Sequence, residues 1–234
     1  MTHYKLIILV IASRSKLYDL FIDKIWKPII QYSKKHHAEI LIKLLFNDIP
    51  TDDLSMNDDI LKYSYTENLI PGVLQKTIDS IDYCNINYTY DYIFRTNLSS
   101  FIIIDRIIDL LDNFEKTNIY RGITDKYSNT TFCSGCGFFL SNDIAHKLVE
   151  SKHLLDYTLI DDVSIGGLLG PISSNKNITR LDIITNLSYS FNSTYFNNLN
   201  ESINDNHIFH VRLKNPNRNA DIVIAHELTN IFYS

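Results

Sequence analysis

The stretch Lys5-Leu6-Ile7-Ile8-Leu9-Val10-Ile11 lies near the start of the chain and decides how the rest is interpreted. No polar side chain interrupts its aliphatic run, a pattern typical of a strand that is covered on both faces. The polar residues Ser13-Arg14-Ser15 follow it. The apolar run is too short to span a bilayer. We therefore expect the central strand of a mainly parallel sheet.

The segments that follow alternate between helical and extended patterns. Apolar residues recur at helical spacing over residues 17–25, and we expect Pro28 to end this helix because proline lacks the donor N–H. A second aliphatic run at 39–45 predicts the next strand. The order strand, helix, strand defines a βαβ unit and favours an α/β fold.

Later segments continue this pattern. Pro71-Gly72 precedes a predicted helix of about three turns, and Tyr92-Ile93-Phe94 predicts another strand. We expect an amphipathic helix over residues 101–114 and a further helix that Ser141 caps. A strand at 208–213 and a helix at 222–231 complete the prediction. Because no repeat or long linker divides residues 1–234, we expect one domain.

The composition excludes several classes of protein. Hydrophobic residues at 45% and charged residues at 21% are typical of a globular domain. The net charge of −5 argues against a general nucleic-acid binder, although it allows a local basic pocket for one anionic ligand. Three cysteines argue against a disulfide framework and for a reducing compartment. We expect a cytoplasmic protein without a transmembrane segment.

The segment Tyr90-Asp91-Tyr92-Ile93-Phe94-Arg95-Thr96-Asn97-Leu98-Ser99-Ser100-Phe101 leads from a buried strand into polar side chains just before a helix. In open α/β sheets, ligands bind at such carboxyl ends of strands. The alternative is a polar loop in which Ser99 or Ser100 only caps the helix.

The segment Cys133-Ser134-Gly135-Cys136-Gly137 has the spacing of a redox motif or of half a zinc site. No second cysteine pair exists to complete a zinc site. We therefore favour small residues that let the backbone approach a ligand closely, with the thiols as small buried side chains.

Two adjacent acids in Ile160-Asp161-Asp162-Val163-Ser164-Ile165-Gly166 stand at the head of a predicted helix. Adjacent carboxylates repel, and a partly desolvated one has a raised pKa, as a general base near neutrality requires. The alternative is that both acids only stabilise the helix N-terminus.

Alternation in His207-Ile208-Phe209-His210-Val211-Arg212-Leu213-Lys214 places His210, Arg212 and Lys214 on one face of a strand. Three potential cations on one face can hold a diphosphate. Arg218 either extends this group or pairs with the nearby Asp221 on the surface. A solvated strand face is the alternative for the whole group.

Taken in order, these segments resemble the β-1,3-glycosyltransferases, the family that includes the β-1,3-galactosyltransferases and the fringe proteins. Glu67-Asn68-Leu69-Ile70-Pro71-Gly72-Val73-Leu74-Gln75-Lys76-Thr77 is similar to the helix with the family's Asn-Leu-Thr-Leu-Lys-Thr signature. Residues 90–101 resemble the strand and loop that hold its metal-binding acidic triplet. Residues 132–141 resemble its acceptor-side Tyr-Cys-Ser-Gly-Gly-Gly-Tyr-Val-Leu-Ser segment, and 161–166 resemble Glu-Asp-Val-Tyr-Val-Gly, which carries its catalytic base. The resemblance spans residues 67–170 and implies the GT-A fold.

One position departs from the family pattern, because Asn97-Leu98-Ser99 stands where the family has its acidic triplet. Hard divalent cations in such sites are normally held by carboxylates, so we expect no tightly bound metal. Protein cations are expected to stabilise the leaving nucleotide diphosphate instead, as metal-independent GT-A enzymes are understood to do. These cations are Arg95, His210, Arg212, Lys214 and Arg218.

The resemblance implies an inverting glycosyltransferase that moves a sugar from a nucleotide sugar, with a UDP-sugar as the first expectation, to a hydroxyl of a glycan or glycoconjugate. Asp162 is expected to take the acceptor proton with support from Asp161. The remaining donor-binding residues are expected to be Ser13, Arg14, Ser15, Lys76, Asn97 and Ser99, while Gly135 and Gly137 shape the acceptor side.

The string from Arg95 to Phe101 also resembles a divergent viral and bacterial branch of glycosyltransferase-like proteins. For a viral member we expect a location in the host cytoplasm. The alternative function is a nucleotide-sugar or glycan-binding protein that kept the fold and lost turnover.

Overall fold

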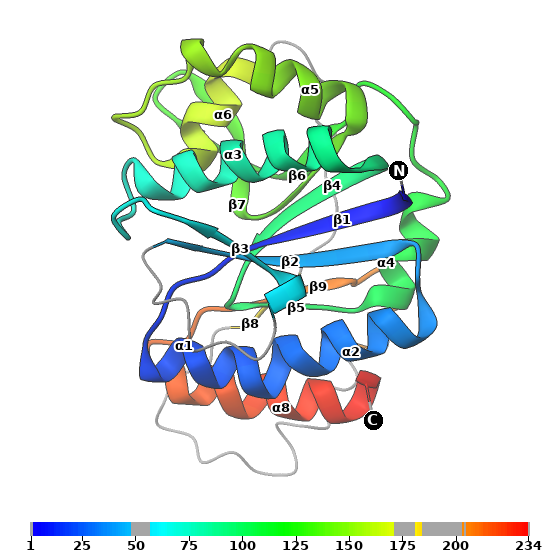
Figure 1. Cartoon of the computed structure of the whole chain (residues 1–234). Helices are drawn as coiled ribbons and strands as arrows, with labels where there is room; N and C mark the ends of the chain where they lie inside the picture. Colours follow the sequence, from blue (N-terminus) through cyan, green and yellow to red (C-terminus); the bar gives the residue numbers. More distant parts are fainter. Residues whose placement is uncertain (1, 48–56, 171–180, 184–202, 204, 234) are drawn as a thin grey trace.

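A computed structural model describes residues 2–47, 57–170, 181–183, 203 and 205–233. Its centre is a six-stranded sheet in the order β3-β2-β1-β4-β7-β6 (Figure 1). The first four of these strands are parallel to one another, β7 runs antiparallel to β4, and β6 runs antiparallel to β7. The strands are β1 (His3–Ile11), β2 (Ile40–Asn47), β3 (Ile60–Tyr63), β4 (Thr89–Asn97), β6 (Tyr120–Tyr127) and β7 (Thr130–Ser141). The predicted mainly parallel α/β sheet is confirmed.

Strand β1 is buried on both faces, as its aliphatic run predicts. Leu6, Ile8 and Val10 join one hydrophobic cluster, and Ile7 and Leu9 join the other. Full burial of such a side chain stabilises the fold by roughly 1.5–3 kcal/mol. Helices α1 (Lys16–Phe21), α2 (Lys27–His36) and α8 (Arg218–Tyr233) cover one face of the sheet, and α3 (Gly72–Asn87), α5 (Asn142–Glu150) and α6 (Asp161–Leu169) cover the other (Figure 1).

The first helical segment does not stop at Pro28. Helix α1 continues through a π-helical segment, Ile22–Trp26, into α2. The N–H of Lys27 donates to the carbonyl of Ile22 five residues back, and Pro28 then falls in the first turn of α2. Pro28 has no N–H to donate, and it directly follows the π-helical segment, where the regular α-helical hydrogen-bond pattern is interrupted. The prediction that Pro28 ends the helix was wrong.

A second, three-stranded sheet has the order β5-β9-β8, formed by β5 (Ser100–Ile102), β9 (His210–Leu213) and β8 (Leu181–Ile183). Ser100 is paired in register with Arg212, so the C-terminal part of the chain reaches the end of β4. Phe101 therefore lies in a strand, and the amphipathic helix α4 (Ile104–Leu111) begins only after Ile103. The alternative in which Ser99 or Ser100 caps that helix was wrong.

For other elements the predicted type is correct, but the predicted length or starting residue differs from the structure. Helix α3 has 16 residues and is longer than the expected three turns, and α8 begins at Arg218 rather than at residue 222. Ser141 occupies the N-cap position of α5, but its hydroxyl donates to Asp143 Oδ1 at 2.5 Å instead of capping the helix. Strand β3 was not predicted. None of the helices in the described ranges is long and apolar enough to cross a membrane.

Candidate active site

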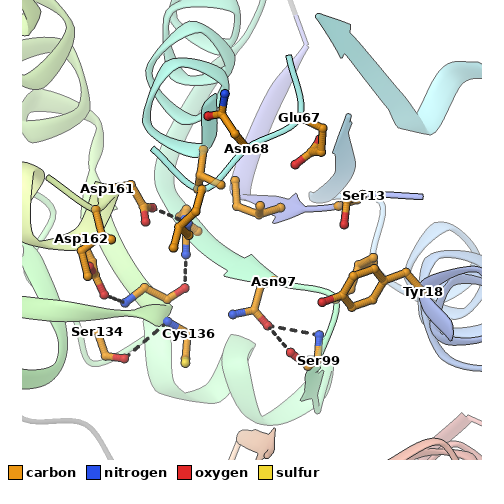
Figure 2. A pocket seen from close by; sticks show the side chains of 18 of the residues that line it. Ser13, Tyr18, Glu67, Asn68, Asn97, Ser99, Ser134, Cys136, Asp161 and Asp162 are labelled. Atoms are coloured by element: carbon orange, nitrogen blue, oxygen red, sulfur yellow. Dashed lines mark hydrogen bonds and ion pairs between the residues drawn. The ribbon is translucent and has the colours of Figure 1, made fainter. Parts of the chain in front are cut away.

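A pocket of about 540 Å³ opens at the carboxyl ends of β1 and β4. Ile11 and Asn97, the last residues of these strands, are register partners. The chain continues from β1 to β2 on one side and β4 lies on the other, so this is the switch point at which open α/β sheets bind ligands. Its volume lies within the roughly 300–1,000 Å³ of ligand pockets. Its polar lining includes Ser13, Tyr18, Glu67, Asn68, Asn97, Ser99, Ser134, Asp161 and Asp162 (Figure 2).

Only some of the predicted site residues line this pocket. The predicted residues that line it are Ser13, Arg95, Asn97, Ser99, Gly135, Asp161, Asp162 and Arg212. The predicted residues that lie outside its wall are Arg14, Ser15, Lys76, Gly137, His210, Lys214 and Arg218.

Asp162 lies in the first turn of α6, and two backbone donors hold its carboxylate. The N–H of Gly135 donates to Oδ2 at 2.8 Å, and the N–H of Val163 donates to Oδ1 at 2.9 Å. Its side chain is half-buried in the pocket wall. Each carboxylate oxygen has a further lone pair, so this group can accept a proton from a bound hydroxyl.

Arg95 and Asp161 form a buried ion pair, with exposed fractions of 3% and 5%. Arg95 also donates to the carbonyl of Gly135. Burial raises the pKa of Asp161, and the guanidinium of Arg95 opposes that rise. Arg95 donates to Asp161 and to the carbonyl of Gly135. This geometry suits a residue that positions the Gly135 backbone better than one that binds a diphosphate.

Asn97 forms a tight turn with the residues that follow it. Its Oδ1 accepts from the N–H of Ser99 at 3.1 Å, from the Ser99 hydroxyl at 3.0 Å and from the Ser100 hydroxyl at 3.4 Å. A backbone N–H can only donate, so the oxygen faces Ser99, and the amide nitrogen is directed away from it (Figure 2). The neighbouring Leu98 is held by Trp26, whose Nε1 donates to its carbonyl at 3.1 Å.

This turn does not fit the divalent cation that the family's acidic triplet holds. The amide oxygen of Asn97 already accepts from the backbone N–H and the hydroxyl of Ser99, and the group left for a ligand is an N–H donor. No group of three or more His, Cys, Asp or Glu side chains in the described ranges could hold a metal ion. The donors suit an anion rather than a cation.

Arg212 comes to the pocket from β9, and its side chain forms no ion pair with any residue that the structure describes. The other cations of this segment lie elsewhere. His210 is buried, with its ring edge-on to Phe94 at 5.7 Å, and a Cβ on Gly137 would lie 2.6 Å from the His210 ring. Position 137 therefore requires glycine because the rings of His210 and Phe94 pack against it. Lys214 follows the strand and is exposed.

Arg218 is held by its own helix. It pairs with Asp221, whose side chain is fully buried, and it donates to the carbonyl of Leu213 at 3.0 Å. The alternative of an Arg218–Asp221 pair therefore describes the geometry, except that Asp221 lies in the interior and not on the surface. Burial raises the pKa of Asp221, and Asn215 and Arg218 oppose that rise.

The residues predicted after β1 also have structural partners. Arg14 pairs with Asp19 at 2.9 Å, and the hydroxyl of Ser15 caps α1 by accepting from the N–H of Tyr18 at 3.1 Å. Lys76 lies under the pocket and is completely buried. Its ammonium donates to the carboxylate of Glu67, which does line the pocket.

The cysteines are buried free thiols. Burial raises the pKa of Cys133 and of Cys84 to about 12 in each case, so neither is ionised near neutrality. Cys136 lines the pocket and its carbonyl accepts from Thr96 at 2.6 Å. The prediction that the thiols are small buried side chains is confirmed.

Glu67 and Tyr18 are pocket residues to which the sequence reasoning gave no role. Glu67 precedes α3, which begins at Gly72, so no helical spacing indicates its pairing with Lys76 nine positions later. Tyr18 lies on the apolar face of α1 and gave no signal of its own.

No protein-family model and no curated protein matches this sequence. Solved structures do match it. A glycosyltransferase involved in glycosylation of the major capsid of PBCV-1 has a TM-score of 0.56 at 8% identity, over 95% of this chain and 98% of that one. The galactosyltransferase LgtC, in complex with donor and acceptor sugar analogues, has a TM-score of 0.54 at 11% identity, over 97% and 96%. These likenesses show that the chain has the GT-A fold of glycosyltransferases.

Proposed function

We propose that this protein is a glycosyltransferase that moves a sugar from a nucleotide sugar to an acceptor hydroxyl, with inversion and without a bound metal ion. One observation carries the proposal: a pocket at the β1/β4 switch point combines the Asp162 carboxylate with the Asn97 amide and the Arg212 guanidinium. The GT-A fold of the chain supports a donor of this class.

Asp162 acts as the general base. It takes the proton of the acceptor hydroxyl while the acceptor oxygen forms a bond to the anomeric carbon of the donor. The bond between that carbon and the phosphate oxygen breaks at the same time, and the nucleoside diphosphate leaves with the electron pair. A single displacement of this kind inverts the anomeric centre. Asp161 and Arg95 hold the Gly135 backbone, which in turn holds Asp162.

Arg212 and Asn97 stabilise the charge of the leaving diphosphate. Charge-assisted hydrogen bonds from a guanidinium to phosphate oxygens are among the strong ones, and the Asn97 N–H groups add neutral donors. Ser99 lines the pocket beside Asn97, and Ser13 lines it on the side of Glu67 (Figure 2). We assign no part of this step to a metal ion, because the Asn97 oxygen is already used within its turn.

The order of the sequence motifs supports a finer assignment to the β-1,3-glycosyltransferase family, with Gly135 on the acceptor side and a UDP-sugar as the first donor to test. We also propose that residues 1–234 form one domain that acts in the cytoplasm. The buried free thiols support a reducing compartment. The divergent viral and bacterial branch remains the proposed source.

A second candidate is a nucleotide-sugar or glycan-binding protein without turnover. The observation that favours it is Asn97-Leu98-Ser99 in place of the acidic triplet. Such a protein binds a donor in the same pocket and transfers nothing, so a transfer assay separates the two candidates.

Thermal melting against a panel of nucleotide sugars, each with EDTA and with Mn²⁺, is the first test. A donor at about 100 times its Kd stabilises the folded state by about 2.7 kcal/mol, or roughly 5–10 °C in Tm. We expect a shift with one donor that survives EDTA. Transfer from that donor to candidate acceptors, with the anomer identified by NMR, then tests turnover and inversion. A shift that requires Mn²⁺ contradicts metal independence, and retention contradicts the single displacement.

A further inference from the structure

Glu67 contributes a carboxylate to the pocket wall, and the transfer chemistry above does not use it. The residue lies between β3 and α3, with about a third of its side chain exposed (34%). A carboxylate repels a diphosphate because both are anions. The oxygens of Glu67 can only accept hydrogen bonds, so they suit a part of the donor that carries hydroxyl groups better than they suit the diphosphate.

Lys76 holds this carboxylate in place from below. Its Nζ donates to Glu67 Oε1 at 2.9 Å and to Oε2 at 3.0 Å, and also to the carbonyl of Ala12 at 2.9 Å. Lys76 is completely buried, so water does not compete for these hydrogen bonds. Ala12 and Ser13, which follow β1, line the same pocket. The lysine therefore ties Glu67 to the carboxyl end of β1.

Acidic side chains lie at two opposite ends of the pocket. Glu67 and Ser13 lie on the opposite side from Asp161 and Asp162, with Asn97 between the two groups in the view of Figure 2. A donor laid across this pocket places its transferable sugar at Asp162 and its diphosphate at Asn97 and Arg212. Its nucleoside then lies at the Glu67 end.

We propose that Glu67 determines specificity for the ribose of the donor nucleotide, with its two oxygens accepting from the 2′- and 3′-hydroxyls. This inference rests on the proposed function. Lys76 bonds both oxygens almost equally, so the carboxylate presents a pair of acceptors to a vicinal diol. Lys76 is the positioning residue of this pair. A nucleotide without these hydroxyls loses the two hydrogen bonds to the charged carboxylate, which then keeps Lys76 alone as its partner, so the site should discriminate against it.

Nucleoside diphosphates test this assignment, because they contain the ribose and the diphosphate but no transferable sugar. UDP, GDP, ADP and CDP are titrated into the full chain by calorimetry, and the tightest binder is compared with its 2′,3′-dideoxy analogue. The variants are Glu67→Gln, Lys76→Met and, as the matched control, Glu150→Gln, which changes an exposed carboxylate on α5 outside the pocket. Thermal unfolding shows whether each variant is folded.

We expect the wild type to bind the ribonucleotide at least about tenfold more tightly than the dideoxy analogue, as hydrogen bonds to a charged group require. Glu67→Gln should lose most of this ratio through weaker ribonucleotide binding, and Glu150→Gln should keep it. Lys76→Met should reduce the ratio because the carboxylate is no longer held. Since Lys76 is buried, Glu67→Gln decides the question if Lys76→Met does not fold.

An unchanged ratio in Glu67→Gln overturns the ribose assignment, while the binding of a nucleoside diphosphate leaves the proposed function standing. Weaker binding of the complete nucleotide sugar alone would place Glu67 against the transferred sugar and would also overturn it. If the wild type binds none of the four nucleoside diphosphates, the proposed function fails and the inference fails with it.

Discussion

The backbone N–H of Gly135 donates a 2.8 Å hydrogen bond to Oδ2 of Asp162, although 27 positions separate the two residues in the chain. The carbonyl of the same glycine accepts from Arg95, which pairs with Asp161. One peptide unit thus links the proposed base to a buried ion pair. The position of the Asp162 carboxylate depends on residues from β4, β7 and α6 together.

Replacement of the proposed base by its amide is the most direct test of mechanism. Asp162→Asn keeps the shape of the side chain but removes its ability to take a proton, so kcat should fall at least about 100-fold. Binding of the nucleoside diphosphate should change little. The matched control is Asp109→Asn, an exposed aspartate on α4. Turnover that survives in Asp162→Asn would remove Asp162 from the role of base.

A methyl group at Gly135 should disturb the link between Arg95 and Asp162. The added Cβ of Gly135→Ala would lie 2.9 Å from Arg95 Nη1 and 3.1 Å from Asp162 Oδ2, so the guanidinium must shift and the carboxylate must give by a few tenths of an ångström. We expect kcat to fall about tenfold or more, since small displacements of catalytic groups are costly, with less effect on the donor KM.

The control for this variant is Gly167→Ala on α6, where the nearest atom to the new Cβ is 3.8 Å away. Alanine in an exposed helical position is expected to stabilise the fold by about 0.5–1 kcal/mol and to leave turnover unchanged. Equal kcat in Gly135→Ala and the wild type would show that the Asp162 position does not limit catalysis.

Two cations from the same segment should differ in their effect on donor binding. Arg212→Ala removes a guanidinium from the pocket wall, and we expect roughly ten- to hundredfold weaker binding of the nucleoside diphosphate by calorimetry. Lys214→Ala, two residues later and outside the wall, should change the Kd little. An equal loss in both variants would indicate long-range attraction in place of direct contact, and it would abolish the proposed role of Arg212.

The free energy of unfolding should fall at alkaline pH because of Tyr65, which lies two residues before Glu67. A hydrogen bond to Asp79, followed by burial, raises the pKa of Tyr65 from 10.0 to about 12. Between these values the unfolded chain has released the tyrosine proton and the native state retains it, so this contribution to stability is complete below pH 10 and is lost as the pH rises toward 12. Urea unfolding at several pH values in this window should show a less steep loss for Tyr65→Phe than for the wild type. Parallel pH profiles for the two proteins would contradict this expectation.

The pattern of apolar residues predicts the core of the fold because it is a local property of the chain. The aliphatic run of β1, the βαβ order and the acids at the head of α6 are all found where the sequence indicates them. The errors occur where distant contacts override local preference. Pro28 stays within a helix because a π-helical segment precedes it, and Phe101 joins β5 because β9 pairs with it.

The α/β class, the polar turn at the end of β4 and the lack of acidic residues in that turn can be predicted from the amino-acid sequence alone. Which charged side chains line the pocket depends on the folded arrangement. Arg95 is taken by Asp161, Arg218 by Asp221 and Lys76 by Glu67, while Arg212 is brought to the pocket. The reason is physical: an ion pair depends on the distance between two groups and on their burial, and for Arg95 and Asp161 the partners lie 66 positions apart. That distance is defined only once the sheet has assembled.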